Sequence, residues 1–193
     1  MNISKPVVLI GFKASGKSTI GRMLAARLNL EYTDTDAIIE GLYTIFEGEQ
    51  LNCREIYKKR GGDYFRKLEL EAVKESLKNN QYSVVSFGGG SLVNAESAGV
   101  DFSGAVFVYL KVEKEELFQR IMRDGVPAFF DPANPSASFE KQFAERAPVY
   151  ERHAHITVEN TSCPVEEAVE NVITELGKIR TALGAGVQLE PGE

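Results

Sequence analysis

Short apolar runs alternate with longer amphipathic stretches along the chain. Runs of strand type lie near residues 6–10, 30–33, 82–87, 104–110 and 155–158. Helical spacing of apolar positions is found near residues 17–29, 36–42, 53–60, 63–79, 94–99, 113–123, 139–151 and 165–182. Alternation of this kind indicates parallel strands joined by right-handed crossovers, with helices on both faces of the sheet. We therefore predict an α/β fold with three layers, α/β/α.

The loop after the first predicted strand carries the most specific signal. Residues 11–18 read Gly-Phe-Lys-Ala-Ser-Gly-Lys-Ser and fit the phosphate-binding (P-loop) pattern G-x-x-x-x-G-K-[ST] in full. In this pattern the lysine, Lys17, reaches the β- and γ-phosphates, and the hydroxyl of Ser18 is placed to ligate Mg²⁺. We therefore predict that the chain binds a nucleoside triphosphate with Mg²⁺, through Gly11, Ala14, Ser15, Gly16, Lys17, Ser18 and Thr19.

The pattern predicts one domain over residues 1–183 and a disordered tail at 184–193. Two segments interrupt its regular alternation. Residues 34–66 are longer and more polar than a simple crossover needs, and residues 123–138 hold three prolines with little periodicity. Long irregular segments in a compact domain often line or cover a binding site. We expect residues 34–66 and 86–91 to form an acceptor-binding region, and residues 123–138 to form a lid.

Composition narrows the range of partners and locations. The net charge of −6 argues against a nucleic-acid partner, which needs a basic surface. The only apolar run near the N-terminus, Val7 to Ile10, is too short for an export signal or a membrane span. Two cysteines, Cys53 and Cys163, form no disulfide framework or metal-binding spacing. We expect a monomeric, cytoplasmic protein with no membrane contact.

Two carboxylates follow the second predicted strand. Asp34 and Asp36 are expected at the carboxyl end of a parallel strand, where they face the phosphate loop. One of them can help to hold Mg²⁺, and the other can accept the proton of an attacking hydroxyl. The alternative is structural, because an aspartate at this position also caps the helix that follows.

Three further features have the chemistry of an acceptor site. Arg66 lies one helical turn before Glu69, which can orient the guanidinium, although a solvated surface pair is the simpler interpretation. Gly88, Gly89 and Gly90 follow a buried strand and leave bare backbone on which a small ligand can lie. Arg146, on the helix after the predicted lid, can clamp a carboxylate or phosphate with two hydrogen bonds.

Together these motifs resemble one family, the shikimate kinases. The resemblance covers about the first 155 residues, in the family's order and spacing. Its pieces are the phosphate loop, Asp34-Thr-Asp36, Phe65-Arg66 with Glu69, Gly88 to Gly90, and Arg146-Ala-Pro-Val-Tyr150. The resemblance implies a five-stranded parallel sheet of order 2-3-1-4-5. It also implies ATP-dependent phosphorylation of the shikimate 3-hydroxyl, in the chorismate pathway to the aromatic amino acids.

The resemblance also implies individual roles. Ser18 and Asp34 match the family's Mg²⁺ residues, and Asp36 matches the aspartate that contacts the acceptor hydroxyls. Arg66 and Arg146 match the arginines that clamp the shikimate carboxylate. The glycine whose backbone contacts shikimate falls within Gly88, Gly89 and Gly90, with Gly89 the best match, and Arg120 is expected near the adenine.

The chain departs from the family at several places, among them Lys13, which adds a charge to the phosphate loop, and Asp63, which stands where a glutamate is usual. Ala14 stands where a glycine is common, the stretch between Glu40 and Phe65 is longer than usual, and Val126 replaces the arginine of the lid. Phosphoryl transfer depends on cations around the transferred group. We therefore predict Arg123 as the substitute, catalytic beside Lys17 and Asp36, with Lys13 as the alternative.

Two other functions remain open at this point. One is a kinase of the same fold that acts on a different polyol acid or on a nucleotide. The other is a regulatory protein that binds a nucleotide without turnover. The absent lid arginine favours the regulatory protein, whereas the intact set Lys17, Ser18, Asp34 and Asp36 argues against it.

Overall fold

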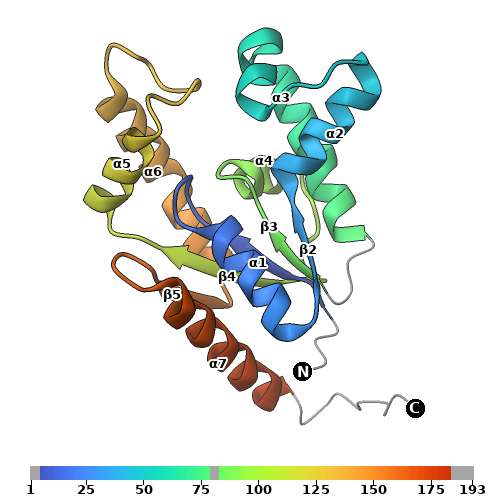
Figure 1. The fold of residues 1–193 in the computed structure, drawn as a ribbon, viewed down its shortest axis with the longest axis vertical. Coiled ribbons are helices and arrows are strands. Elements are labelled where there is room, and N and C mark those ends of the chain that lie inside the picture. Colours follow the sequence, from blue (N-terminus) through green and yellow to red (C-terminus); the bar gives the residue numbers. More distant parts are fainter. Residues whose placement is uncertain (1–4, 79–82, 184–193) are drawn as a thin grey trace.

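A parallel sheet of five strands runs through the centre of the molecule, as the computed structural model in Figure 1 shows. The structure describes residues 5–78 and 83–183. The strand order is β2-β3-β1-β4-β5, which confirms the predicted order. The strands are β1 (Val7–Ile10), β2 (Glu31–Asp34), β3 (Ser83–Ser86), β4 (Val106–Lys111) and β5 (Ile156–Glu159).

Helices cover both faces of this sheet, so the three-layer prediction is also confirmed (Figure 1). The helices are α1 (Lys17–Leu28), α2 (Thr35–Glu47), α3 (Cys53–Lys78), α4 (Ser91–Ser97), α5 (Lys114–Arg123), α6 (Pro135–His153) and α7 (Val165–Leu183). Alternate residues of β1 face opposite layers, as the period of a strand requires. Val7 and Leu9 pack towards α1 and α7, whereas Val8 and Ile10 pack with residues of α3 to α6.

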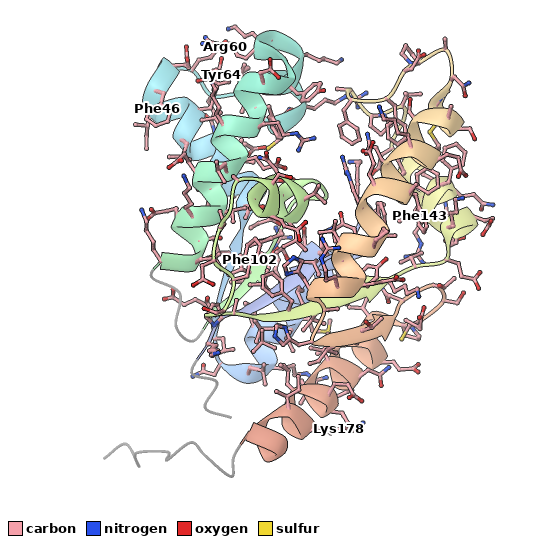
Figure 2. All side chains as sticks on the ribbon, turned by 180° about the vertical axis from the view of Figure 1, so that it is seen from behind. Phe46, Arg60, Tyr64, Phe102, Phe143 and Lys178 are labelled. Carbon is pink, nitrogen blue, oxygen red and sulfur yellow. The ribbon has the colours of Figure 1, made fainter. Side chains whose placement is uncertain are left out.

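A third apolar cluster joins α2 to α3 at one side of the sheet. Its buried members are Ile39, Tyr43, Ile56, Leu68 and Ala72. The two helices predicted at 53–60 and 63–79 both lie within α3, where the non-helical Gly61, with φ 80° and ψ 172°, separates them by a kink. A residue with a side chain rarely takes this conformation. Figure 2 shows the outer end of this unit at Phe46, Arg60 and Tyr64.

The irregular stretch between α5 and α6 is shorter than residues 123–138, where the sequence predicted a lid. Helix α5 still includes Arg123, and α6 already begins at Pro135, so the irregular part is residues 124–134. Proline suits the first turn of a helix, and the Asn134 side chain accepts a capping hydrogen bond from the Ala137 N–H at 3.1 Å. We call residues 124–134 the lid segment. The tail predicted at 184–193 lies outside the described residues.

Candidate active site

A cavity of about 340 Å³ lies beside the phosphate loop and the loop that follows β3. Helices α2 and α3 contribute one wall, and the lid segment and α6 contribute another. This is the edge of a parallel sheet at which ligands are expected. The predicted site residues that line it are Ala14, Lys17, Ser18, Asp34, Asp36, Arg66, Gly88, Gly89, Gly90 and Arg146.

The phosphate loop has the tight backbone that its sequence predicts. Gly11 and Gly16 have φ angles of 141° and 89°, and Ala14 has a φ of 64° in the left-handed region, where glycine is favoured. The amide of Asn160, just after β5, donates to the Ser15 carbonyl at 2.9 Å. Sequence reasoning missed Asn160, although a polar residue at the carboxyl end of a strand is a recognisable signal.

The buried ammonium of Lys17 is bound to its own loop. It donates to the carbonyls of Gly11 at 3.0 Å and Phe12 at 2.7 Å. Burial lowers the pKa of Lys17 to about 8, and the negative charges of Asp36 and Asp34 oppose this shift. Lys17 therefore stays mostly protonated at pH 7, and offers a cation to an anionic group in the cavity.

Asp34 caps α2 and also accepts hydrogen bonds from two hydroxyl groups. One carboxylate oxygen caps α2 by accepting from the Asp36 N–H at 3.1 Å. The other accepts from the Ser18 hydroxyl and from the Tyr32 hydroxyl, each at 2.9 Å. The capping role is thus present, and it leaves a hydroxyl and a carboxylate together at the cavity wall.

This oxygen pair fits Mg²⁺. Magnesium is typically held by one or two protein oxygens, together with substrate phosphates and water. Within residues 5–78 and 83–183 no cluster of three or more His, Cys, Asp or Glu side chains is suited to a metal ion, so a site built entirely from such side chains is not found there. The Ser18 hydroxyl and the Asp34 carboxylate supply the one or two protein oxygen ligands that a nucleotide-bound Mg²⁺ needs.

Asp36 lies in the first turn of α2, two residues after Asp34, and also lines the cavity. The surrounding protein raises the pKa of Asp36 to about 6, mainly by removing part of the hydration of its carboxylate. The negative charge of Asp34 adds to this rise, and the positive charge of Lys17 opposes it. At pH 7 the carboxylate is mostly ionised and can accept a proton.

Arg66 pairs with a buried carboxylate, although its own side chain is 38% exposed. Its guanidinium donates to a carboxylate oxygen of Glu69 at 2.5 Å, and the Glu69 side chain is only 3% exposed. The second Glu69 oxygen accepts from the Ser91 hydroxyl at 3.0 Å. A buried carboxylate satisfied on both oxygens holds the guanidinium in one orientation.

The glycine triplet allows both arginines to approach. Arg146 donates to the Gly89 carbonyl at 3.0 Å, and the Tyr150 hydroxyl also donates to that carbonyl. A Cβ atom on Gly90 would lie 2.4 Å from a guanidinium nitrogen of Arg66. Burial lowers the pKa of Arg146, and the charge of Arg66 adds to that shift, so two cations face the same part of the cavity.

Six predicted site residues are not among those that line this cavity: Gly11, Ser15, Gly16, Thr19, Arg120 and Arg123. Arg120 donates to Glu116 at 2.8 Å and to the Thr161 carbonyl. The side chain of Arg123 is 68% exposed and lies 3.8 Å from Glu116. Neither is among the residues that line the described cavity. The adenine contact of Arg120 and the lid role of Arg123 therefore remain predictions.

The sequence analysis also missed a cation that does line the cavity. Arg54, at the start of α3, donates to the carbonyl of Val126 in the lid segment at 2.9 Å. No motif marks this arginine, because its partner is 72 residues away and is a backbone atom.

Comparisons with known proteins agree with this geometry. The family model described as shikimate kinase matches residues 13–177. A shikimate kinase of Thermobifida fusca is 37% identical over 174 residues, which span 90% of this chain and 96% of that protein. One of Thermus thermophilus is 36% identical over 180 residues, spanning 93% and 94% of the two chains.

Solved structures give the same result. The shikimate kinase of Acinetobacter baumannii, in complex with shikimate, superposes with a TM-score of 0.74 and 26% identity over 97% of both chains. The shikimate kinase of Aquifex aeolicus gives a TM-score of 0.70 and 33% identity over 93% of this chain and 99% of that one. From the family match, the relatives and the shared fold, this chain belongs to the shikimate kinase family.

Proposed function

We propose that this chain transfers the γ-phosphoryl group of ATP to the 3-hydroxyl of shikimate. The observation that carries the proposal is the convergence of two arginines, Arg66 and Arg146, in the cavity that also contains Lys17 and Asp36. Two guanidinium groups suit the planar carboxylate of shikimate, and a carboxylate suits the hydroxyls of its ring. Family membership supports the same substrate.

The acceptor end of the cavity would bind shikimate by its charge and its hydroxyls. Arg66, oriented by Glu69, and Arg146, supported on the Gly89 carbonyl, would hold the substrate carboxylate. Asp36 would then accept a hydrogen bond from the reacting hydroxyl and take its proton as the oxygen attacks. A pKa of about 6 suits this role near neutral pH, because the carboxylate is free to accept a proton.

The nucleotide end would hold the ATP phosphates. The N–H groups of the phosphate loop and the ammonium of Lys17 would surround the β- and γ-phosphates. Ser18 and Asp34 would hold a Mg²⁺ ion, whose chemistry there is to neutralise charge on the phosphate oxygens. Exchange of the Gly11 and Phe12 carbonyls for phosphate oxygens would release Lys17 from its own loop.

We further propose that the protein is cytoplasmic, monomeric and independent of nucleic acid and membranes. The negative net charge supports the absence of a nucleic-acid surface. Cys53 and Cys163 are both free thiols, which supports a reducing location. Among the described helices, none combines the length and apolar character needed to cross a bilayer.

A coupled assay of ADP release tests the proposed reaction. The purified protein is supplied with ATP and Mg²⁺, with shikimate, with gluconate or with a nucleoside monophosphate as acceptor. We expect ADP release that depends on shikimate, and formation of shikimate 3-phosphate in equal amount. The matched control is Lys17→Met, which keeps an unbranched side chain of similar size but removes its charge. A folded protein that binds ATP but releases ADP with gluconate alone, or with no acceptor, contradicts the proposal.

A further inference from the structure

The lid segment brings no positive charge of its own to the cavity. Residues 124–134 contain no lysine or arginine and two aspartates, Asp124 and Asp131. Yet lid residues Gly125 and Pro127 line the same cavity as Lys17 and Asp36. In phosphoryl transfer, negative charge spreads over the equatorial oxygens of the transferred group, and cations that meet it there account for much of the rate.

Helix α3 places an arginine at this position. The Arg54 guanidinium donates to the Val126 carbonyl at 2.9 Å, and its side chain lines the same cavity as Lys17 and Ser18. A ring contact joins the same two elements, because Tyr57 and Phe129 lie edge to face with centroids 6.3 Å apart. In Figures 1 and 2 the lid segment and the first part of α3 approach each other above the sheet.

Three of the other cations that line the cavity already have structural partners, whereas the fourth, Lys13, has an exposed side chain on the phosphate loop. Lys17 is bound to its own loop, Arg66 to Glu69 and Arg146 to the Gly89 carbonyl. Within the described part of the chain, Arg54 forms no ion pair and one hydrogen bond, to a neutral carbonyl. A guanidinium has five N–H donors, so Arg54 can keep the lid segment and still donate to an anion.

We propose that Arg54 is a catalytic residue that supplies the cation of the closed lid. It contacts the transferred phosphoryl group while it holds the Val126 carbonyl. The inference rests on the proposed function for the identity of the acceptor. In the transfer, the acceptor oxygen bonds to the γ-phosphorus as the bond to the β–γ bridging oxygen breaks. The hydroxyl proton passes to Asp36, ADP leaves with the bridging oxygen, and Arg54 stays protonated throughout.

Steady-state kinetics of Arg54→Ala tests the assignment. We expect kcat to fall by about 100- to 1,000-fold, as for the loss of one oriented donor to a transition state. The dissociation constants of ATP and shikimate should change by less than about threefold, since the contact forms with the transferred group. The matched control is Lys58→Ala on the same helix, an exposed cation outside the cavity lining, which should leave kcat unchanged.

A second variant distinguishes the positive charge of Arg54 from its hydrogen bond to the lid segment. Arg54→Ala combined with Val126→Arg places a guanidinium on the lid itself, and we expect it to recover at least about tenfold of the lost kcat. No recovery means that Arg54 only fixes the lid, which overturns the proposal. It is equally overturned if Arg54→Ala keeps kcat, or if the loss is confined to shikimate affinity. Loss of kcat in Arg123→Ala with full kcat in Arg54→Ala would assign the lid charge to Arg123 instead.

Binding of ADP with aluminium fluoride keeps this test independent of the acceptor. The planar or octahedral fluoride complex mimics the transferred phosphoryl group, and calorimetry measures its binding against that of ADP alone. We expect Arg54→Ala to weaken the fluoride complex at least about tenfold and ADP alone by less than about threefold. If Arg54→Ala weakens the fluoride complex as expected but the wild type does not phosphorylate shikimate, the proposed function fails and the role of Arg54 stands. If the fluoride complex is unaffected in Arg54→Ala, the role of Arg54 fails.

Discussion

The hydroxyl of Ser18 donates a hydrogen bond of 2.9 Å to the carboxylate of Asp34, which joins the start of α1 to the start of α2. Sixteen residues separate the two positions in the chain. The contact places a phosphate-loop hydroxyl and a strand-end carboxylate side by side at the cavity wall. The two residues that the sequence assigned to Mg²⁺ therefore meet in the fold.

Asp34→Asn should raise the Mg²⁺ concentration needed for half-maximal activity by at least about tenfold. The amide loses the negative charge but keeps an oxygen that can cap α2, so the fold should be retained. A titration of activity with Mg²⁺ at saturating ATP measures the effect, with thermal unfolding as the check on folding. Asp101→Asn is the matched control, since Asp101 also accepts from a backbone N–H, that of Ser103, but in a loop away from the cavity. Equal Mg²⁺ requirements in wild type and Asp34→Asn would remove Asp34 from the metal site.

Arg66→Ala should lose both acceptor affinity and stability. We expect shikimate binding to weaken by about 2–5 kcal/mol, while ATP affinity changes little. The free energy of unfolding should fall by about 1–3 kcal/mol, because Glu69 keeps a buried charge without its partner. Arg146→Ala should show the loss of affinity with a smaller loss of stability, since its protein partner is a neutral carbonyl.

The double variant Arg66→Ala with Glu69→Gln separates the two effects. Removing the charge of Glu69 should restore most of the stability, and the amide can still pair with the Ser91 hydroxyl. Acceptor affinity should stay low, because the guanidinium is still absent. Calorimetry with shikimate and urea unfolding provide the two measurements. A double variant that regains shikimate affinity would mean that Arg66 serves only to neutralise Glu69.

The raised pKa of Asp36 has a defined cause that a single substitution can test. The negative charge of Asp34 is the second largest contribution to the rise, after loss of hydration. Asp34→Asn should therefore lower the pKa of Asp36 from about 6 towards its ordinary value. A ¹³C NMR titration of the carboxyl group in the free protein measures this directly, without the titration of ATP phosphates. An unchanged pKa would show that the Asp34 charge does not act on Asp36.

The raised pKa of Asp36 also predicts how its ionisation changes the free energy of unfolding with pH. The pKa of Asp36 is higher in the folded protein than in the unfolded chain, so the folded state disfavours its ionised form. This destabilisation is present above about pH 6 and disappears as the pH falls towards 4. Asp36→Asn should thus be more stable than the wild type at pH 7.5, with the difference shrinking at pH 4.5. It should also lower kcat, since an amide cannot accept the acceptor's proton. A wild type that is more stable than the variant at pH 7.5 would contradict the sign.

The sequence predicted those parts of the molecule that depend on local pattern. The five strands and the ends of most helices follow from alternation of apolar and polar residues. Motif spacing at strand ends predicted Lys17, Ser18, Asp34 and Asp36, whereas the roles of Arg66 and Arg146 came from the resemblance to the family. Contacts between segments that lie far apart in the chain have no local sequence pattern that predicts them. Asn160 reaches Ser15 across 145 residues, and Arg54 reaches Val126 across 72. The position of Arg54 depends on the packing of α2 against α3 and on where the lid segment passes, and neither has a periodic signature.

Gly90→Ala tests whether the glycine triplet exists to admit Arg66. A Cβ atom at this position would lie 2.4 Å from a guanidinium nitrogen, far closer than van der Waals contact allows. Gly90 has φ −110° and ψ −12°, so alanine meets no backbone strain there. The side chain of Arg66 must therefore move, and its hydrogen bond to Glu69 must lengthen or break. We expect shikimate affinity to fall at least about tenfold, with ATP affinity unchanged within about threefold. Gly104→Ala is the matched control, because a Cβ atom there meets no other atom within 4 Å. If Gly90→Ala binds shikimate as tightly as the wild type, the guanidinium of Arg66 does not need its observed position to hold the acceptor.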